Sequence, residues 1–298
     1  MERGLAVQTL APWRLTDYVT LTKPRIILLL VVTAYCAMVA AEGGWPGWML
    51  TVDTLGGLTL SIGAAHAINM WFDRDIDQLM ERTRRRPVAS GRLAPEEALS
   101  FGIFLETASF MWLTWSVNSW TAAASLAGFL FYVLVYTVWL KRRTTQNIVI
   151  GGAAGAFPPL VGWAAVNPHL GWAPWLMFVI IFLWTPPHFW ALALYKQEDY
   201  RRANIPMLPV VKGRSVTTRQ MAVYALLLIP ASLALYAVDP ALGTLYLASA
   251  VILDLLFGAA VWTLWRQWPP MTPERVFASS LFYMAGLFGS MVLGTLWH

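Results

Sequence analysis

Charged residues and cysteines are both scarce in this chain. Only 12% of its 298 residues are Asp, Glu, Lys or Arg, about half of the ~25% typical of a soluble globular domain. The single cysteine, Cys36, excludes an internal disulfide. The first residues lack both the apolar core and cleavage site of a signal peptide and the Arg/Ser-rich composition of a transit peptide. This composition favours a bacterial cytoplasmic-membrane protein over a soluble one.

Apolar residues take the place of the missing charges. They make up 58% of the chain, and the mean hydropathy is +0.55. Several uncharged runs reach the roughly 20 residues that a helix needs to cross a bilayer. We expect an all-α integral membrane protein, one domain over 1–298 with an N-terminal arm at 1–22. The nine predicted spans lie near 26–41, 52–70, 99–117, 121–140, 147–165, 173–194, 220–237, 242–265 and 277–297.

Lysine and arginine are absent from every second loop of this assignment. Because cytoplasmic loops carry the excess of basic residues, the N-terminus is predicted to be cytoplasmic and the C-terminus outside. The net charge of +5 then describes one membrane face in contact with lipid, and no nucleic-acid partner is expected. All 21 basic residues lie in the N-terminal segment, which includes Arg3, Arg14, Lys23 and Arg25, or in the 71–98, 141–146, 195–219 and 266–275 loops.

An acidic stripe closes the second predicted span. Asn69, Asp73 and Asp77 stand four residues apart, so at about 100° per residue they share one helix face with His66. Asp75 falls on the opposite side and is expected to be solvated or paired with an arginine. Carboxylate and amide oxygens suit Mg²⁺, which usually accompanies a phosphorylated substrate. The alternative is a helix end stabilised by salt bridges to the arginines at 82 and 84–86.

Basic residues close to this stripe are candidates for binding phosphate oxygens. Arginine does so through charge-assisted, often bidentate contacts. For each of these residues a topological or lipid-binding role is the alternative. The candidates are Lys23, Arg25, Arg84, Arg85, Lys141 and Arg142, with Arg86 next to them in the sequence.

The chain has two long polar loops: 71–98 follows the second predicted span, and 195–219 follows the sixth. This separation by four spans suggests a diverged internal duplication, with halves at about 23–145 and 146–298. If the sixth helix continues into the loop, His188 and Asp199 lie on one stripe with Lys196 beside it. Asp199 then completes a metal site, and Lys196 holds a phosphate as a point charge.

Four residues inside spans call for separate comment. His66 and His188 lie at matched depth near the cytoplasmic ends of their spans, which places a substrate or cofactor role on a level with simple hydrogen-bonded packing. Glu106 and Asp254 belong to no motif, and we expect them to pair across helices.

These motifs resemble a known family. The N-x-x-x-D-x-x-x-D of Asn69–Asp77, followed by a basic run and Pro87, is similar to the first signature of the UbiA-type intramembrane prenyltransferases. The segments TKPR at 22–25, WLKRRTTQNIVIGGAAGAFPPLVGW at 139–163 and PPHFWALALYKQEDYRRANIPMLPVVKG at 186–213 resemble its haem O synthase (protohaem IX farnesyltransferase) branch. Many superfamily members carry a second D-x-x-x-D after the sixth span, where this chain has His188, Lys196 and Asp199.

The resemblance implies nine helices around a cytoplasm-facing cavity, with farnesyl diphosphate and haem B as substrates and Mg²⁺ as cofactor. It implies that a farnesyl group is added to a haem vinyl group, together with water, to give haem O. It further implies contact with haem A synthase or with terminal-oxidase assembly factors. The metal ligands are then Asn69, Asp73, Asp77 and Asp199. These four residues and Lys196 are the catalytic residues, and Lys196 also binds the diphosphate. Haem is bound by His66 and His188.

Three other functions fit parts of the same pattern. A related prenyltransferase acting on a quinone precursor or a chlorin shares the acidic stripe but does not account for the histidine pair. A secondary transporter also carries intramembrane acids and repeats, but its site lies near the midplane. A haem-binding electron carrier leaves the stripe and the arginines unexplained.

Overall fold

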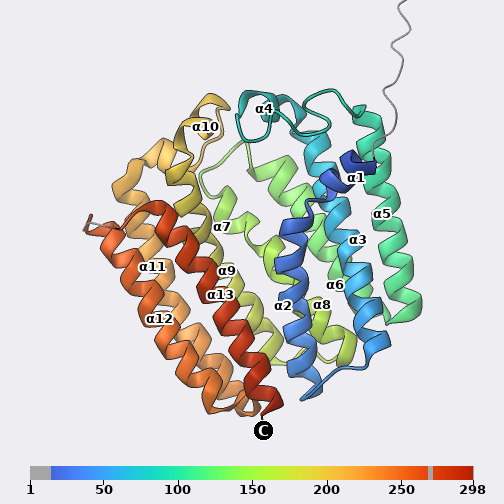
Figure 1. The fold of residues 1–298 in the computed structure, drawn as a ribbon, viewed down its shortest axis with the longest axis vertical. Helices are drawn as coiled ribbons and strands as arrows, with labels where there is room; N and C mark the ends of the chain where they lie inside the picture. The colour runs from blue at the N-terminus through green and yellow to red at the C-terminus, as the bar shows by residue number, and fades with distance from the viewer. Residues whose placement is uncertain (1–14, 268–270, 298) are drawn as a thin grey trace, which may run out of the picture.

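The computed structural model describes residues 15–267 and 271–297, and Arg3 and Arg14 lie outside these ranges. The regular elements in the described ranges are helices, most of which run side by side along the long axis of the molecule (Figure 1). They are α1 (Leu15–Thr22), α2 (Pro24–Glu42), α3 (Trp48–Phe72), α4 (Arg74–Leu79), α5 (Pro95–Ser116), α6 (Ser119–Leu130), η1 (Phe131–Leu140), α7 (Asn147–Gly151), α8 (Ala153–Val166), α9 (Trp172–Tyr195), α10 (Gln197–Arg202), α11 (Leu208–Val238), η2 (Pro240–Leu242), α12 (Gly243–Trp265) and α13 (Pro273–Leu296).

The described helices confirm an all-α, multi-pass membrane protein. Seven helical segments among the described residues are long and apolar enough to cross a membrane. Helices α3 and α5, which cover the predicted spans 52–70 and 99–117, pack along each other but are not among these seven. Both carry buried polar side chains, such as His66 in α3 and Glu106 in α5, which lower their hydropathy. The count of nine spans therefore stays a prediction.

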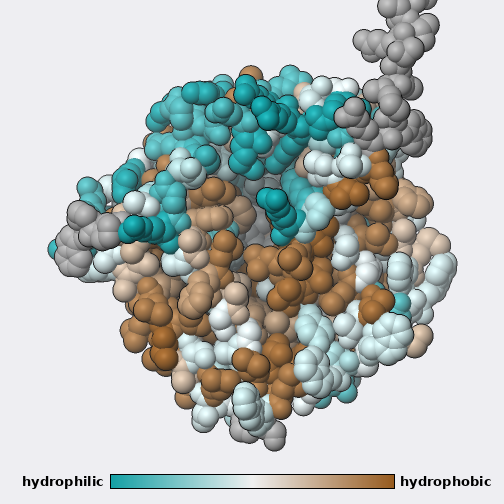
Figure 2. Space-filling view, in the orientation of Figure 1, coloured by the Kyte–Doolittle hydropathy of each residue, from teal (hydrophilic) through white to brown (hydrophobic). Residues whose placement is uncertain are grey.

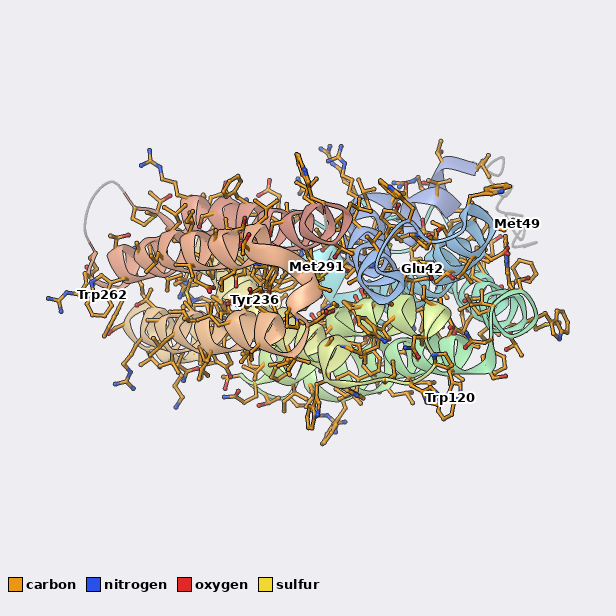
Figure 3. The ribbon with its side chains drawn as sticks, turned by 90° about the horizontal axis from the view of Figure 1, so that it is seen from below. Glu42, Met49, Trp120, Tyr236, Trp262 and Met291 are labelled. Atoms are coloured by element: carbon orange, nitrogen blue, oxygen red, sulfur yellow. The ribbon has the colours of Figure 1, made fainter. Side chains whose placement is uncertain are left out.

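Polar and apolar surfaces separate along the bundle. Hydrophilic residues gather at the end that carries α4 and α10, and hydrophobic residues cover much of the middle (Figure 2). Trp120 and Trp262 lie at the periphery of the bundle (Figure 3), with 65% and 46% of their surface exposed. Exposed tryptophans of this kind suit the lipid and its interface with water.

The predicted boundary of the seventh span misses helical structure at the polar end. Helix α11 begins at Leu208, twelve residues before the predicted span 220–237, because a first helical part precedes a kink at Gly213 (φ 77°). Glycine adopts this left-handed conformation without the steric cost of a Cβ atom. The fourth span changes within its length from the α-helix α6 to the π-helix η1, which ends where Lys141 N–H donates to Tyr136 C=O at 2.9 Å.

Helices α2 and α8 approach each other closely at Gly162. A Cβ atom at this position would lie 2.0 Å from the carbonyl oxygen of Ala34. Small residues at membrane helix interfaces allow such an approach. The contact fixes α2 against α8, and both helices line the cavity described below.

A buried polar network ties α11, α12 and α13 together. Asp254 Oδ2 accepts a hydrogen bond from Ser232 Oγ at 2.6 Å, and Oδ1 accepts one from Tyr283 OH at 2.8 Å. Tyr246 OH donates to Ser232 C=O at 3.0 Å. This confirms that Asp254 pairs across helices. For Glu106 of α5 the same prediction is not confirmed, since its buried Oε2 has no hydrogen-bond partner among the described residues.

Replacing Asp254 with alanine should destabilise the bundle without changing its chemistry. The hydroxyls of Ser232 and Tyr283 would lose a buried acceptor, at a cost of about 1–3 kcal/mol in unfolding free energy. Asp254→Asn, which keeps one acceptor oxygen, serves as the milder control. Thermal unfolding in detergent measures the difference, and an unchanged midpoint in Asp254→Ala would contradict a stabilising role.

Candidate active site

A cavity of about 460 Å³ lies inside the bundle and is lined by two chemically distinct sets of residues. One set is basic, acidic and amide side chains from the polar end of the molecule. The other is apolar and aromatic side chains from the helices below. The polar set is Lys23, Arg25, Asn69, Asp77, Arg82, Arg86 and Lys141, and the aromatic set includes Phe129, Tyr132, Tyr136, Phe157, Trp184, Phe189 and Phe277.

The acidic stripe is assembled where α3 gives way to α4. Helix α3 ends at Phe72, and Asp73 (φ −88°, ψ 7°) joins it to α4. The backbone N–H groups of Asp73 and Asp77 still donate to the carbonyls four residues earlier, at 2.9 and 2.8 Å. Asn69 and Asp77 therefore both line the cavity, and Asp73 lies fully buried next to Asn69.

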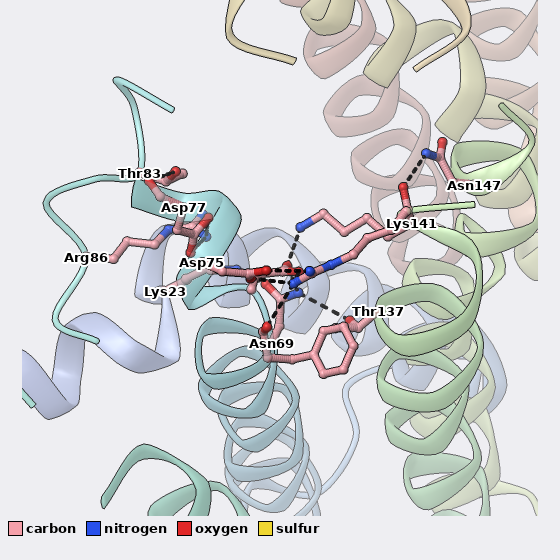
Figure 4. A network of polar contacts seen from close by, with 12 residues as sticks. Lys23, Asn69, Asp75, Asp77, Thr83, Arg86, Thr137, Lys141 and Asn147 are labelled. Atoms are coloured by element: carbon pink, nitrogen blue, oxygen red, sulfur yellow. Dashed lines mark hydrogen bonds and ion pairs between the residues drawn. The ribbon is translucent and has the colours of Figure 1, made fainter. Parts of the chain in front are cut away.

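Asn69 connects the stripe to two neighbouring segments. Its Nδ2 donates to Asp73 Oδ2 at 2.7 Å and to Thr137 Oγ1 of η1 at 3.2 Å (Figure 4). Its Oδ1 accepts a hydrogen bond from Lys23 Nζ at 3.1 Å. Lys23 has a left-handed backbone (φ 54°), a strained conformation for a non-glycine residue that is often found at functional sites. Burial, followed by the charges of Arg86 and Lys141, holds the pKa of Lys23 well below its usual value.

Each carboxylate of the stripe is paired with a cation. Arg86 NH1 contacts Asp77 Oδ1 and Oδ2 at 2.9 and 2.6 Å. Lys141 Nζ donates to Asp73 Oδ2. Of the salt bridges expected as the alternative for this helix end, the one to Arg86 is present, and both Arg86 and Lys141 line the cavity.

Asp75 points away from the stripe, as the helical spacing predicted. Its side chain is 60% exposed and accepts two hydrogen bonds from Arg142, both at 2.7 Å. This hydrogen bonding by Arg142 lowers the pKa of the Asp75 carboxyl below its usual value. Arg142 NH2 also lies 3.4 Å from Asp73 Oδ1. Because Arg142 does not line the cavity, it contacts the acidic stripe on the side away from the cavity.

The structure changes the choice of arginines in the first loop. Arg84 and Arg85 do not line the cavity, and Arg84 is instead 3.8 Å from Glu81 on the surface. Arg82 and Arg86 do line it. The loop is irregular, so helical spacing could not say which arginines face inward.

The second loop does not join the cavity as predicted. Helix α9 ends at Tyr195, and Lys196 (φ −107°, ψ 27°) breaks the helical stripe that was to carry His188 and Asp199. The Lys196 ammonium lies 4.2 Å from the centre of the Tyr195 ring. Neither Lys196 nor Asp199 lines the cavity, whereas Tyr200 does. Burial raises the pKa of the Tyr200 hydroxyl.

Both histidines line the cavity, in different surroundings. His66 packs edge-on against Tyr132, with 5.4 Å between ring centres, and neither of its buried ring nitrogens has a hydrogen-bond partner in the described part of the chain. His188 is stacked on Trp184 and Phe277, and its Nδ1 lies 2.7 Å from Ser280 Oγ.

The oxygen donors of the stripe fit Mg²⁺ in kind. Among residues 15–267 and 271–297, no group of three or more His, Cys, Asp and Glu side chains is placed to hold a metal, so Asp199 does not complete a set with Asp73 and Asp77. Mg²⁺, however, is usually bound by one or two carboxylates together with water and substrate phosphates. Two carboxylates and the Asn69 amide oxygen, beside a cationic cavity wall, meet that requirement.

Comparison with solved structures gives the same fold. Digeranylgeranylglyceryl phosphate synthase superposes with a TM-score of 0.79 at 17% identity, covering 95% of this chain and 99% of that one. A UbiA homologue from Archaeoglobus fulgidus bound to GPP and Mg²⁺ superposes with a TM-score of 0.63 at 16% identity, covering 92% and 99%. At these identities the similarity concerns the fold alone.

Comparison with curated sequences is more specific. The protoheme IX farnesyltransferase of Symbiobacterium thermophilum is 55% identical over 279 residues, 93% of each chain. That of Gloeobacter violaceus is 50% identical over 279 residues, 93% of this chain and 91% of its own. The sequence model of the UbiA prenyltransferase family matches residues 30–287. The chain therefore belongs to the UbiA prenyltransferase family and, within it, groups with the protoheme IX farnesyltransferases.

Proposed function

We propose that this chain transfers a farnesyl group from farnesyl diphosphate to a vinyl group of haem B, with addition of water, to give haem O. The observation that carries the proposal is one continuous cavity that joins a cationic, carboxylate-bearing end to an apolar, aromatic interior. Such a cavity suits a substrate with a diphosphate head and an isoprenoid tail. The 55% identity to a curated protoheme IX farnesyltransferase supports haem as the acceptor.

The polar end is suited to binding the diphosphate. Lys23, Arg25, Arg82, Arg86 and Lys141 reach the cavity from three separate segments of the chain. Asn69, Asp73 and Asp77 would hold Mg²⁺, which supplies further positive charge to the phosphate oxygens when bound. Preorganised cations stabilise the charge that grows on a leaving group, and this lowers the barrier to its departure.

The apolar interior is suited to the carbocation chemistry. When the allylic C–O bond breaks, its electron pair leaves with the diphosphate and a farnesyl cation remains. The π electrons of the haem vinyl group form the new C–C bond, the resulting cation takes up water, and a proton is released. Tyr132, Tyr136 and Phe157 line this part of the cavity, where ring faces attract a cation and apolar walls exclude stray water.

Product mass tests the proposed reaction directly. Purified protein in detergent is incubated with haem B, farnesyl diphosphate and Mg²⁺, and the expected product has the mass of haem B plus one farnesyl group and one hydroxyl group, since one proton of the added water is released. Omitting Mg²⁺, or adding a chelator, should abolish its formation. Prenylation of a quinone precursor or a chlorin in place of haem would overturn the acceptor assignment.

The kinetics of Lys196 test whether the second loop takes part. Lys196 and Asp199 do not line the cavity, so their predicted roles rest on the sequence alone. We therefore expect Lys196→Ala to keep kcat/KM within about threefold of the parent value, because a charge outside the cavity is screened by solvent. Steady-state rates at varied farnesyl diphosphate measure this. A large fall in kcat would instead mean that the segment around Lys196 closes over the diphosphate during turnover.

The same proposal extends to the setting of the enzyme. The polar end of the bundle would face the cytoplasm of a bacterium, with the other end outside the cytoplasmic membrane. Haem A synthase or a terminal-oxidase assembly factor would be the natural recipient of an apolar haem product. The termini themselves lie outside the described residues.

A further inference from the structure

The ring of His188 is held rigidly between two helices. Trp184, one turn earlier in α9, stacks on it with 4.2 Å between ring centres and planes 20° apart. Phe277 of α13 stacks on it at 4.5 Å and 26°. Two stacked rings at these distances must occupy opposite faces of the imidazole. Trp184 is itself fixed, because its Nε1–H donates to Ser280 C=O at 2.8 Å.

The hydrogen bonds of Ser280 determine which nitrogen of His188 carries the proton. A serine hydroxyl has one proton to donate. Ser280 Oγ lies 2.6 Å from the carbonyl oxygen of Phe277, which can only accept, so the serine proton is directed there. The 2.7 Å contact between Ser280 Oγ and His188 Nδ1 must then be donated by Nδ1–H. This assignment leaves the lone pair of the neutral ring on Nε2.

The Nε2 atom of His188 is free to meet a ligand. It has no hydrogen-bond partner among the described residues, and it is not one of their fully buried polar atoms. His188 lines the cavity, so Nε2 is reached from there. In His66, by contrast, both ring nitrogens are buried without partners and no neighbour fixes the tautomer.

We propose that Ser280 holds His188 in the Nδ1-protonated form, so that Nε2 ligates the iron of the haem substrate. Neutral imidazole is a common axial ligand of haem iron. A hydrogen bond from the second ring nitrogen orients such a ligand and raises its basicity. His188 is thus the iron ligand, and Ser280 is a positioning residue that acts through it. This inference rests on haem being the acceptor and selects His188 from the two predicted haem-binding histidines.

Haem titrations of four purified variants test the proposal. Ferric haem B is added to the detergent-solubilised parent, His188→Ala, Ser280→Ala, Ser280→Thr and Ser290→Ala, and the Soret band is followed. Ser290→Ala is the matched control, because Ser290 is a buried serine of α13 that donates to Leu287 C=O and does not line the cavity. Farnesyl diphosphate binding and thermal unfolding check that each variant is folded.

The variants should separate ligation from tautomer control. His188→Ala should lose the histidine-ligated Soret band, and added imidazole should restore it. Ser280→Ala should bind haem about 10–100-fold more weakly, the usual effect of removing such a partner. The iron–histidine stretching band of its reduced form should also move to lower frequency. Ser280→Thr, which keeps the hydroxyl, should recover the parent values, and Ser290→Ala should equal the parent.

Each result has a distinct meaning. A parent-like spectrum and affinity in folded His188→Ala would overturn iron ligation by His188. A parent-like affinity and stretching frequency in Ser280→Ala would overturn the role of Ser280. If the parent itself does not bind haem, the proposed function fails, and with it this inference. A structural role for the serine in helix packing would change thermal stability but not the iron–histidine frequency.

Discussion

Replacing Asp73 or Asp77 with asparagine is expected to lower kcat for farnesyl transfer by about 10³-fold or more, the scale expected when a metal site loses a ligand charge. Asp77 lines the cavity, and Asp73 is fully buried beside Asn69. Asparagine keeps the size of each side chain but removes the charge that would hold Mg²⁺ against the diphosphate. Product formation by the purified variants at saturating Mg²⁺ is the measurement.

Asp75→Asn is the matched control for both substitutions. Asp75 is in the same short segment, but its side chain is 60% exposed and paired with Arg142 outside the cavity. It should keep most of the parent activity. Full activity in Asp73→Asn or Asp77→Asn would contradict the assignment of these residues as metal ligands. An inactive Asp75→Asn would show that activity depends on the charge of the whole segment.

Replacing Lys141 with alanine is expected to reduce kcat by about 10²–10³-fold, as when one donor to a developing oxyanion is removed. Lys141 lines the cavity and is ion-paired with Asp73. Its charge would interact most strongly with the leaving diphosphate, so kcat should fall more than the KM for farnesyl diphosphate rises. Lys141→Arg keeps the charge and should retain part of the activity.

Lys212→Ala provides the charge-matched control for Lys141. Lys212 is exposed on α11 and does not line the cavity, so its removal should leave both kinetic constants near the parent values. If Lys141→Ala changed KM alone, the ammonium would contribute equally to ground-state and transition-state binding. It would then be a docking residue for the diphosphate and not a group that assists its departure.

Hydropathy and helical spacing predicted the parts of the molecule that depend on local periodicity. Runs of apolar residues located the long helices, and the four-residue spacing of Asn69, Asp73 and Asp77 brought these residues together. The spacing succeeded even though α3 ends at Phe72, because the backbone hydrogen bonds of Asp73 and Asp77 keep the four-residue pattern. The resemblance to a known family supplied the acceptor, which no spacing could give.

Sequence reasoning failed where chain direction depends on irregular structure. The first loop folds through contacts such as Gln78 Nε2 to Ala89 C=O at 3.1 Å and Arg92 NH2 to Arg85 C=O at 3.0 Å. These contacts turn Arg82 and Arg86, rather than Arg84 and Arg85, toward the cavity. The side-chain direction of Lys196 was missed for a related reason, since α9 ends at Tyr195 and the break at Lys196 changes the direction of every later side chain. The internal duplication stays a prediction.

The π-helix η1 makes the site sensitive to insertions and deletions more than to substitutions. Phe131–Leu140 leads directly into Lys141, and its lipid-facing side chains, such as Leu134 and Trp139, are more than half exposed. Apolar exchanges at those positions leave the path of the backbone intact. Loss of one codon without a change of turn type would shift Lys141 by one residue along the helix and so rotate its side chain away from Asp73. Over evolutionary time this segment is therefore free to drift in composition, while its length is constrained by the chemistry at its end.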